Sequence, residues 1–200
     1  MAAITMGIST SNSRFVAYCT RHGFVGTAQR AALAVRRALF SNRSVLFYCD
    51  LATQSAPAAG IPDFLKVERK KSSAELSPED LQSMTSLWNP KLGHRNVKER
   101  FGKGASLWLI KSEGKLAGFG WTLRGRTMEP HFLPLGKDNP YLFDGFILPQ
   151  HRGRGLMPSW LNHALHELTA ECSGRAFTGI AEWNQAIPAS LKKLPFVAWV

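Results

Sequence analysis

Apolar residues gather in short runs bounded by turn residues, and these runs predict β-strands. The segment SLWLIKSEGKLAGFGWTLRG contains two of them, residues 106–112 and 115–124, with a tight turn at Glu113-Gly114 between them. The segment YLFDGFILP predicts a third strand of this group. Further strands are predicted at SVLFYCDL, at AFTGIAEW and in the final apolar FVAWV.

Helical segments show a different spacing of apolar positions. Residues 156–173 carry a one-sided apolar face that ends at Gly174, which predicts a helix stopped by a glycine. Ser77 followed by Pro78 and two acids is a typical helix start. KERFGKG predicts a short helical turn, and residues 185–194 a short helix. Strands and helices in this order predict an α/β or α+β fold, with one sheet flanked by helices.

The first part of the chain has a different charge from the rest. The formal net charge is +11, and residues 1–49 hold six arginines with no lysine and no acid. We therefore expect a basic extension over residues 1–43 and a folded domain over 44–200. Residues 24–40 predict an amphipathic helix in that extension. Packing on its own domain is favoured for this helix over contact with a membrane surface.

Cysteine usage indicates a reducing, cytoplasmic location. Cys19, Cys49 and Cys172 are an odd, widely spaced set without a C-x-x-C pair, which argues against disulfides and a zinc site. No apolar run is long enough to cross a bilayer. The acid-free N-terminus also fits an organellar transit peptide, and this alternative stays open.

Two glycines and two arginines alternate between the third strand and the following helix. Arg152-Gly153-Arg154-Gly155 precedes a helix start, where free N–H groups and the helix dipole favour an anion. Leu156-Met157 excludes the G-K-[ST] of a P-loop, and Pro158 replaces the third glycine of a dinucleotide fingerprint. The pattern predicts a phosphate or pyrophosphate site, with a plain basic turn as the alternative.

Two motifs together resemble the GCN5-related N-acetyltransferase (GNAT) family. The first is FILPQHRGRGLMPSWLNHAL, which fits the R-x-x-G-x-[GA] connection between a central strand and a helix. The second, AEWNQAIPASLKKLPF, follows at the expected separation. The resemblance covers roughly residues 65–200. It implies a single mixed, mostly antiparallel sheet with a V-shaped splay between its central strands.

The resemblance also implies a reaction and a set of contacts. An acyl group, most often acetyl, would pass from acetyl-CoA to a primary amine by direct attack in a ternary complex. No metal is implied, and the amine would belong to a small molecule or a protein. The coenzyme-binding residues implied are Phe146, Ile147, Leu148, Arg152, Gly153, Arg154, Gly155, Leu156, Met157 and Asn184.

The sequence departs from the family pattern at four places. Met157 stands where glycine or alanine is usual, Leu191 where many members have a tyrosine that protonates the thiolate, and Pro195 where glycine is usual. The sequence ends at Val200, within the expected sixth strand, with no seventh. A truncated chain, a homodimer in which a partner supplies strand pairing, and an irregular last segment are the alternatives.

Two acids are candidates for the base that deprotonates the amine. Asp144 interrupts an otherwise apolar strand, and Glu182 ends the next one, where the family's central strands splay apart. A structural hydrogen bond is the alternative role for Asp144. His163 and His166 lie three apart on a helix without a third ligand, so we expect them in solvent.

Two other functions compete with acyl transfer. The basic charge and the tryptophans Trp88, Trp108, Trp121 and Trp160 would suit a nucleic-acid-binding protein. These tryptophans occupy core-like positions, however, and no binding motif accompanies them. A non-catalytic relative that only binds coenzyme A is the other alternative, supported by Leu191.

Overall fold

A computed structural model describes most of the predicted domain. The described residues are 44–53, 61–86, 90–128, 135–181, 184, 187, 191–192 and 194–199. The predicted extension, its helix at 24–40 and the boundary after residue 43 lie outside them. None of the described helices is both long and apolar enough to cross a membrane.

Seven strands form one open mixed sheet. Its order is β2-β3-β4-β5-β6-β1-β7, and among these described strands only β5 and β6 run parallel. The strands are β1 (Ser44–Asp50), β2 (Leu65–Lys70), β3 (Ser106–Ser112), β4 (Lys115–Arg124), β5 (Pro140–Ile147), β6 (Arg175–Ala181) and β7 (Val197–Trp199). The predicted single sheet, mixed and mostly antiparallel, is confirmed.

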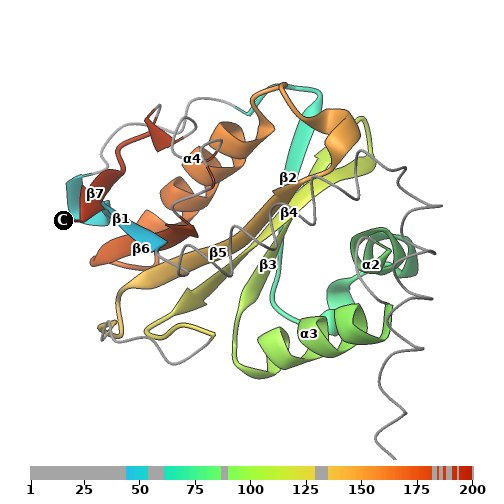
Figure 1. Ribbon diagram of the computed structural model, residues 1–200, viewed down its shortest axis with the longest axis horizontal. Helices are drawn as coiled ribbons and strands as arrows, with labels where there is room; N and C mark the ends of the chain where they lie inside the picture. Colours follow the sequence, from blue (N-terminus) through green and yellow to red (C-terminus); the bar gives the residue numbers. More distant parts are fainter. Residues whose placement is uncertain are drawn as a thin grey trace, which may run out of the picture. The chain divides into compact units, whose positions relative to one another are not determined.

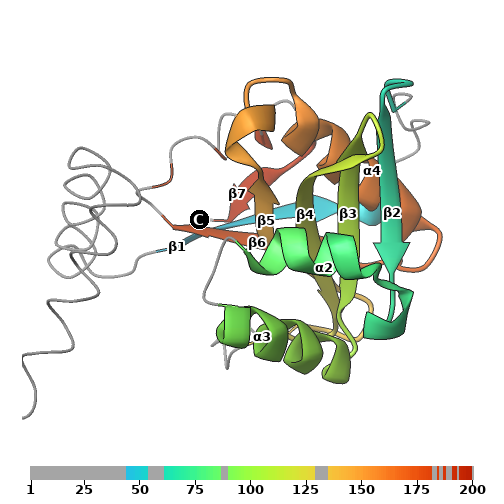
Figure 2. The same ribbon diagram turned by 90° about the vertical axis from the view of Figure 1, so that its right-hand side faces the viewer.

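Helices cover both faces of this sheet (Figures 1 and 2). Helix α4 (Leu156–Thr169) packs in one apolar cluster, and α2 (Pro78–Thr85) and α3 (Pro90–Gly102) pack in a second. Alternate residues of the strands feed the two clusters, as the two-residue period of a strand requires. Thus Trp108 faces α4, whereas Leu107 and Leu109 face α2 and α3.

Local signals placed several elements correctly. The β3–β4 hairpin has the predicted bounds, and its turn residues Glu113 and Gly114 have φ of 53° and 78°. Two consecutive positive φ values are typical of a type I′ turn, which twists with the strands. The predicted cap of α2 also forms, because the Ser77 hydroxyl accepts a hydrogen bond from the Asp80 N–H at 3.1 Å.

Two elements were missed or shortened in the sequence analysis. Strand β2 was not predicted, because its LKVERK has two apolar residues among four charged ones. Helix α3 has thirteen residues where only a short turn was predicted, since its pattern is weak. Its Gly93 allows close packing on α2: a Cβ there would lie 3.0 Å from the Thr85 side chain.

Strand β1 lies inside the sheet. It pairs antiparallel with β6 from Ser44–Ala181 to Asp50–Arg175, and on its other side with β7. Strand β1 therefore occupies the space between β6 and β7, and β7 forms this edge of the sheet. The expectation that a seventh strand would be missing was wrong, because Val197–Trp199 forms one, and the homodimer stays a prediction.

We expect proline to be poorly tolerated in the middle of β1. Phe47 is paired with Thr178 on one side and Ala198 on the other, so its N–H lies within a ladder whichever way it faces. Phe47→Pro should lower the free energy of unfolding by about 2 kcal/mol or more, measured by chemical denaturation. Ser44→Pro, at the first residue of the strand, is the matched control and should cost much less. Equal unfolding midpoints for the two variants would contradict an internal position for β1.

Candidate functional site

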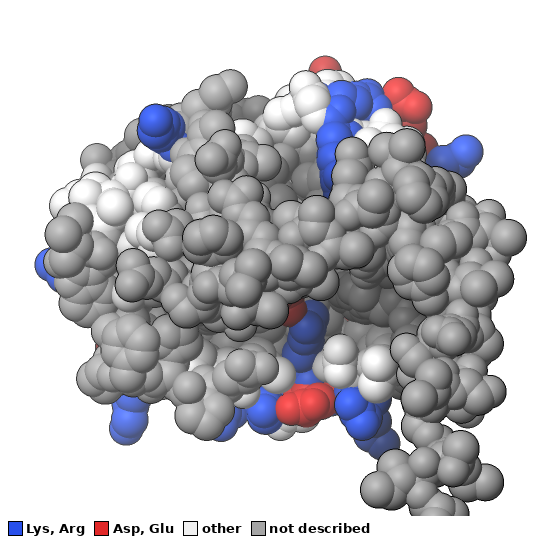
Figure 3. All heavy atoms as spheres, in the orientation of Figure 1, with Lys and Arg blue, Asp and Glu red and all other residues white. Residues whose placement is uncertain are grey.

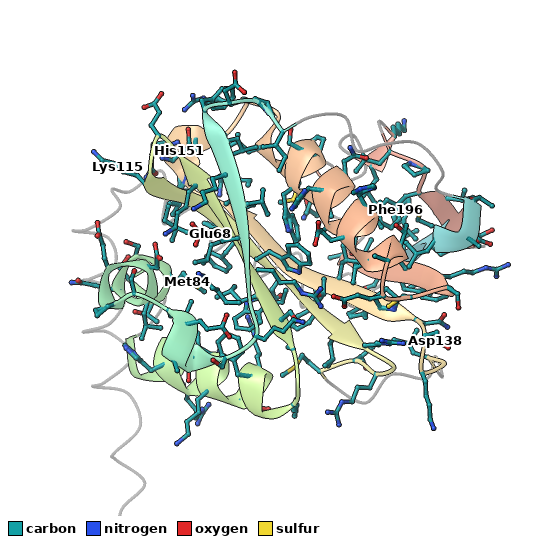
Figure 4. All side chains as sticks on the ribbon, turned by 180° about the vertical axis from the view of Figure 1, so that it is seen from behind. Glu68, Met84, Lys115, Asp138, His151 and Phe196 are labelled. Atoms are coloured by element: carbon teal, nitrogen blue, oxygen red, sulfur yellow. The ribbon has the colours of Figure 1, made fainter. Side chains whose placement is uncertain are left out.

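The arginine–glycine loop lies where β5 ends and α4 begins. His151, labelled in Figure 4, marks this end of the sheet, and Asp138 lies at the other end. Gly153 and Gly155 have φ of 77° and 73°, in the left-handed region that favours glycine. A Cβ on either residue would meet nothing within 4 Å. The glycines are therefore required by backbone conformation, and the space above the loop is open.

Helix α4 presents its first N–H groups to this open space. The N–H of Ser159 donates a hydrogen bond to the carbonyl of Gly155, the residue just before the helix, at 3.2 Å. The N–H groups of Leu156 and Met157 precede it and have no acceptor within the helix. Together with the positive end of the helix dipole, they favour an anion at this place, and pyrophosphate binding there stays a prediction.

The two loop arginines point to different neighbours. Arg152 donates from Nε to Ile147 O at 3.1 Å, and its guanidinium lies 5.4 Å from the Phe146 ring centre. Arg154 lies 5.4 Å from the ring centre of Phe64, just before β2. Arg152 therefore also fastens the loop to the end of β5, a role that the sequence did not indicate.

Hydrogen bonding across β4 and β5 determines which backbone groups remain available to a ligand. The Leu148 N–H donates to Ala117 O at 2.9 Å, so Leu148 directs its polar groups toward β4. Because these directions alternate along a strand, Phe146 also faces β4 and Ile147 faces the β6 side. Of the three residues predicted to contact the coenzyme arm through their backbone, Ile147 is the one directed away from β4, and its carbonyl already accepts a hydrogen bond from Arg152.

Strands β5 and β6 separate after a short parallel pairing. Their register comprises Tyr141–Phe177 and Leu142–Thr178, and beyond these pairs a pocket of about 190 Å³ opens. The pocket is lined by Asp144 and Gly145, by β6 residues from Thr178 to Ala181, and by the first turns of α4. This is the V-shaped splay that the sequence predicted.

A β-bulge shapes the β5 wall of the pocket. Phe143 pairs with Trp121 and Phe146 with Phe119, so Asp144 and Gly145 together oppose Gly120. Asp144 has φ of 48°, a left-handed value that is uncommon outside glycine, although aspartate tolerates it better than most residues.

An ion pair holds Asp144 at the bulge. Its carboxylate pairs with Arg100 of α3, whose guanidinium lies 5.1 Å from the Trp121 ring centre and 5.6 Å from that of Phe143. The Arg100 side chain is 11% exposed, and that of Asp144 is 53% exposed. An acid within an apolar strand is expected to be buried, but Asp144 is exposed because the bulge turns this residue outward.

The other predicted site residues divide into three groups. Met157 and Asn184 line the pocket, and so does Leu191, which is 2% exposed. Leu156 is buried beneath the loop. Glu182 lies outside the described residues, so its position beside the pocket stays a prediction.

Three residues of the site were missed in the sequence analysis. Arg100 comes from a helix whose face could not be assigned, so no signal in the sequence joined it to β5. Trp160 was considered only as a core residue, although it also lines the pocket. Gly145, a glycine inside an apolar strand, is a recognised sign of a bulge and could have been found.

The described residues do not support the nucleic-acid alternative. Trp108, Trp121 and Trp160 are 1%, 0% and 1% exposed, so they are not available to stack on bases. On the face shown in Figure 3, the described Lys and Arg side chains that are visible lie at several separate places, with acids beside some of them. Trp88 lies outside the described residues.

Of the two histidines on α4, one is not in solvent as expected. His166 is exposed, but His163 packs edge-on against Trp108, with ring centres 6.1 Å apart. Burial lowers the pKa of His163 below its ordinary value. Within the described part of the chain, no group of three or more His, Cys, Asp or Glu side chains is placed to hold a metal.

Solved structures show the same fold at low sequence identity. A GNAT-family acetyltransferase from Colwellia psychrerythraea is 12% identical over 78% of this chain and 52% of its own length, with a TM-score of 0.54. The glucosamine N-acetyltransferase region of a fungal multi-domain GH3 β-N-acetylglucosaminidase is 13% identical over 85% of this chain and 22% of its own length, with a TM-score of 0.52. A GNAT-family protein from Novosphingobium aromaticivorans DSM 12444 is 14% identical over 78% of this chain and 60% of its own length, with a TM-score of 0.50. The chain thus spans between about a fifth and three fifths of the length of these proteins.

The sequence itself was compared with known families and proteins. No curated protein sequence matches it. The family model described as "Acetyltransferase (GNAT) family" matches residues 73–192, which is more than half of the chain. This range contains the bulge, the splay, the glycine loop and α4. The chain therefore belongs to the GNAT acetyltransferase family.

Proposed function

We propose that this protein transfers an acetyl group from acetyl-CoA to a primary amine by direct attack in a ternary complex. The observation that carries the proposal is the opening between β5 and β6, which leads to the glycine loop at the start of α4. An elongated thioester with a pyrophosphate at one end fits this combination. A binding protein for coenzyme A without catalysis is the second candidate, favoured by the buried Leu191 in place of a tyrosine.

The coenzyme would bind along β5 and α4. Its pyrophosphate would accept hydrogen bonds from loop N–H groups between Gly153 and Met157, with Arg152 and Arg154 supplying charge. Its amide-containing arm would pair with the backbone of Ile147. Asn184 lines the pocket and would contact the same arm from the opposite wall. Phe146 and Leu148 would contribute through their positions in the strand, since their polar backbone groups face β4.

The reaction requires a neutral amine next to the thioester carbonyl. The amine nitrogen forms a bond with the carbonyl carbon, the carbon–sulfur bond breaks, and coenzyme A leaves as a thiolate. The proton lost by the amine passes to a base and finally to the thiolate. Positioning and oxyanion stabilisation would account for most of the acceleration. A thiolate is already a good leaving group, so a tyrosine at position 191 is not essential.

Asp144 and Glu182 are the proposed bases. Asp144 is among the residues that line the pocket, and its carboxylate is half exposed and paired with Arg100, so an acceptor could reach it from solvent. Glu182 is the next residue in the sequence after β6, and its place at the splay is part of the proposal. The acceptor is an amine of a small molecule or protein, and the net charge of +11 disfavours a polycation.

The buried free thiols Cys49 and Cys172 support a cytoplasmic location.

Coenzyme binding should depend on the glycine loop. Gly155→Asp places a carboxylate where pyrophosphate would lie, and Arg152→Glu reverses a charge there, so each should abolish acetyl-CoA binding measured by calorimetry. Gly114→Asp is a matched control, because Gly114 also has a left-handed φ and open space around it but lies in the β3–β4 turn. It should lose a similar amount of stability and keep full affinity. A wild-type protein without measurable affinity for any acyl-CoA at millimolar concentration would refute the proposed function.

Loss of the base should slow turnover without weakening coenzyme binding. We expect Asp144→Asn or Glu182→Gln to lower kcat by roughly ten- to ten-thousand-fold, measured with a free-thiol assay. The defect should shrink as pH rises, because more of the acceptor is then already neutral. Asp138→Asn is the control, since Asp138 is also an ion-paired, exposed acid but lies at the far end of the sheet. Full activity at pH 7 in the double variant of Asp144 and Glu182 would exclude both acids.

A further inference from the structure

The indole of Trp160 is seated against two glycines of the sheet. A Cβ on Gly120 of β4 would lie 2.1 Å from its Cη2 and Cζ2 atoms, and a Cβ on Gly145 of β5 would lie 2.8 Å from Cζ3. These distances are far below van der Waals contact, so any side chain at either position would displace the ring. Gly120 and Gly145 face each other across the bulge. The two strands thus form a notch that fits this tryptophan.

The seated indole is also a wall of the pocket. Trp160 is 1% exposed and lines the pocket together with Met157 from the preceding turn of α4. At the inner end, the pairing of Leu142 with Thr178 brings β5 and β6 together again. A ligand that enters from the loop and follows β5 past Ile147 therefore meets Trp160 and Met157 beside it and the joined strands ahead.

The pocket is small for the ligand it is proposed to hold. Its volume of about 190 Å³ lies below the roughly 300–1,000 Å³ typical of small-molecule sites. It can enclose the thioester end of a coenzyme but leaves little room for a long acyl chain. Of the two wall residues on α4, Met157 has a flexible side chain that can move aside. The indole has only two rotatable bonds and is held in the glycine notch, so it cannot.

We propose that Trp160 is the specificity-determining residue for acyl length, and that it restricts this protein to acetyl and similarly short acyl groups. The inference rests on the proposed function, because it takes the pocket as the place of the acyl group. It goes further by assigning the chain-length limit to one side chain and to the two glycines that seat it.

The test compares acyl-CoA substrates of different length. We would measure kcat/KM for acetyl-CoA, butyryl-CoA and hexanoyl-CoA with wild type, Trp160→Phe and Trp160→Leu. One methylene in an apolar pocket changes discrimination by roughly 10- to 200-fold. The butyryl-to-acetyl ratio should therefore rise at least about tenfold in Trp160→Leu, with a smaller rise in Trp160→Phe.

A matched control separates specificity from packing. Leu168 is 3% exposed on the same helix and does not line the pocket, so Leu168→Ala should reduce stability and leave the butyryl-to-acetyl ratio unchanged. If Trp160 served the core alone, its variants would behave like Leu168→Ala. An unchanged ratio in a folded Trp160→Leu protein would overturn the inference.

Two further measurements keep the outcome decisive. Should Trp160→Leu fail to fold, Trp160→Phe carries the comparison and should shift preference toward butyryl-CoA, whereas an equal shift in Met157→Ala would contradict the assignment of the limit to Trp160. If wild type binds acyl-CoA without turnover, calorimetric affinities for acetyl-CoA and butyryl-CoA replace the rates, with the same expected shift in their ratio. Acyl-CoA binding with an unaltered length preference would refute this inference alone. A wild type that binds no acyl-CoA would refute the proposed function and this inference with it.

Discussion

The site depends on one extra residue in β5. Asp144 and Gly145 oppose the single residue Gly120, which breaks the regular ladder with β4 at the point where β5 leaves β6. The same irregularity turns Asp144 out toward Arg100 and opens the notch for Trp160. A bulge increases local twist and bends its strand. The pocket, the oriented carboxylate and the seated indole are thus three results of one backbone feature.

The opening between β5 and β6 lasts because each strand is held by its other neighbour. On one side, β4 pairs with β5 on both sides of the bulge, and α2 and α3 cover that region. On the other side, β1 pairs with the whole length of β6. Each wall belongs to a ladder of its own, so the two can separate without leaving an unsupported edge. Arg152 adds a tie between the glycine loop and the end of β5.

Features set by short stretches of sequence were predictable, and features set by distant pairing were not. The Glu113-Gly114 turn, the Ser77 cap and the two loop glycines follow from local conformational preferences. Family resemblance added the single mixed sheet and the splay between its central strands. The place of β1 between β6 and β7 could not be predicted, because pairing across the full chain leaves no local pattern. Arg100 was missed for the same reason. The exposure of Asp144 does not follow from the apolar pattern of its strand, because that pattern assumes a strand without a bulge.

The position of β1 has a consequence for how the protein is made. Its partners β6 and β7 are the last of the described strands to be synthesised, whereas β1 is synthesised before every other described element. The far wall of the pocket is therefore completed only after β6 has been made. Pairing of this kind has high contact order and slows folding. A chain interrupted between α4 and β6 would hold the glycine loop and the helix but lack a finished pocket.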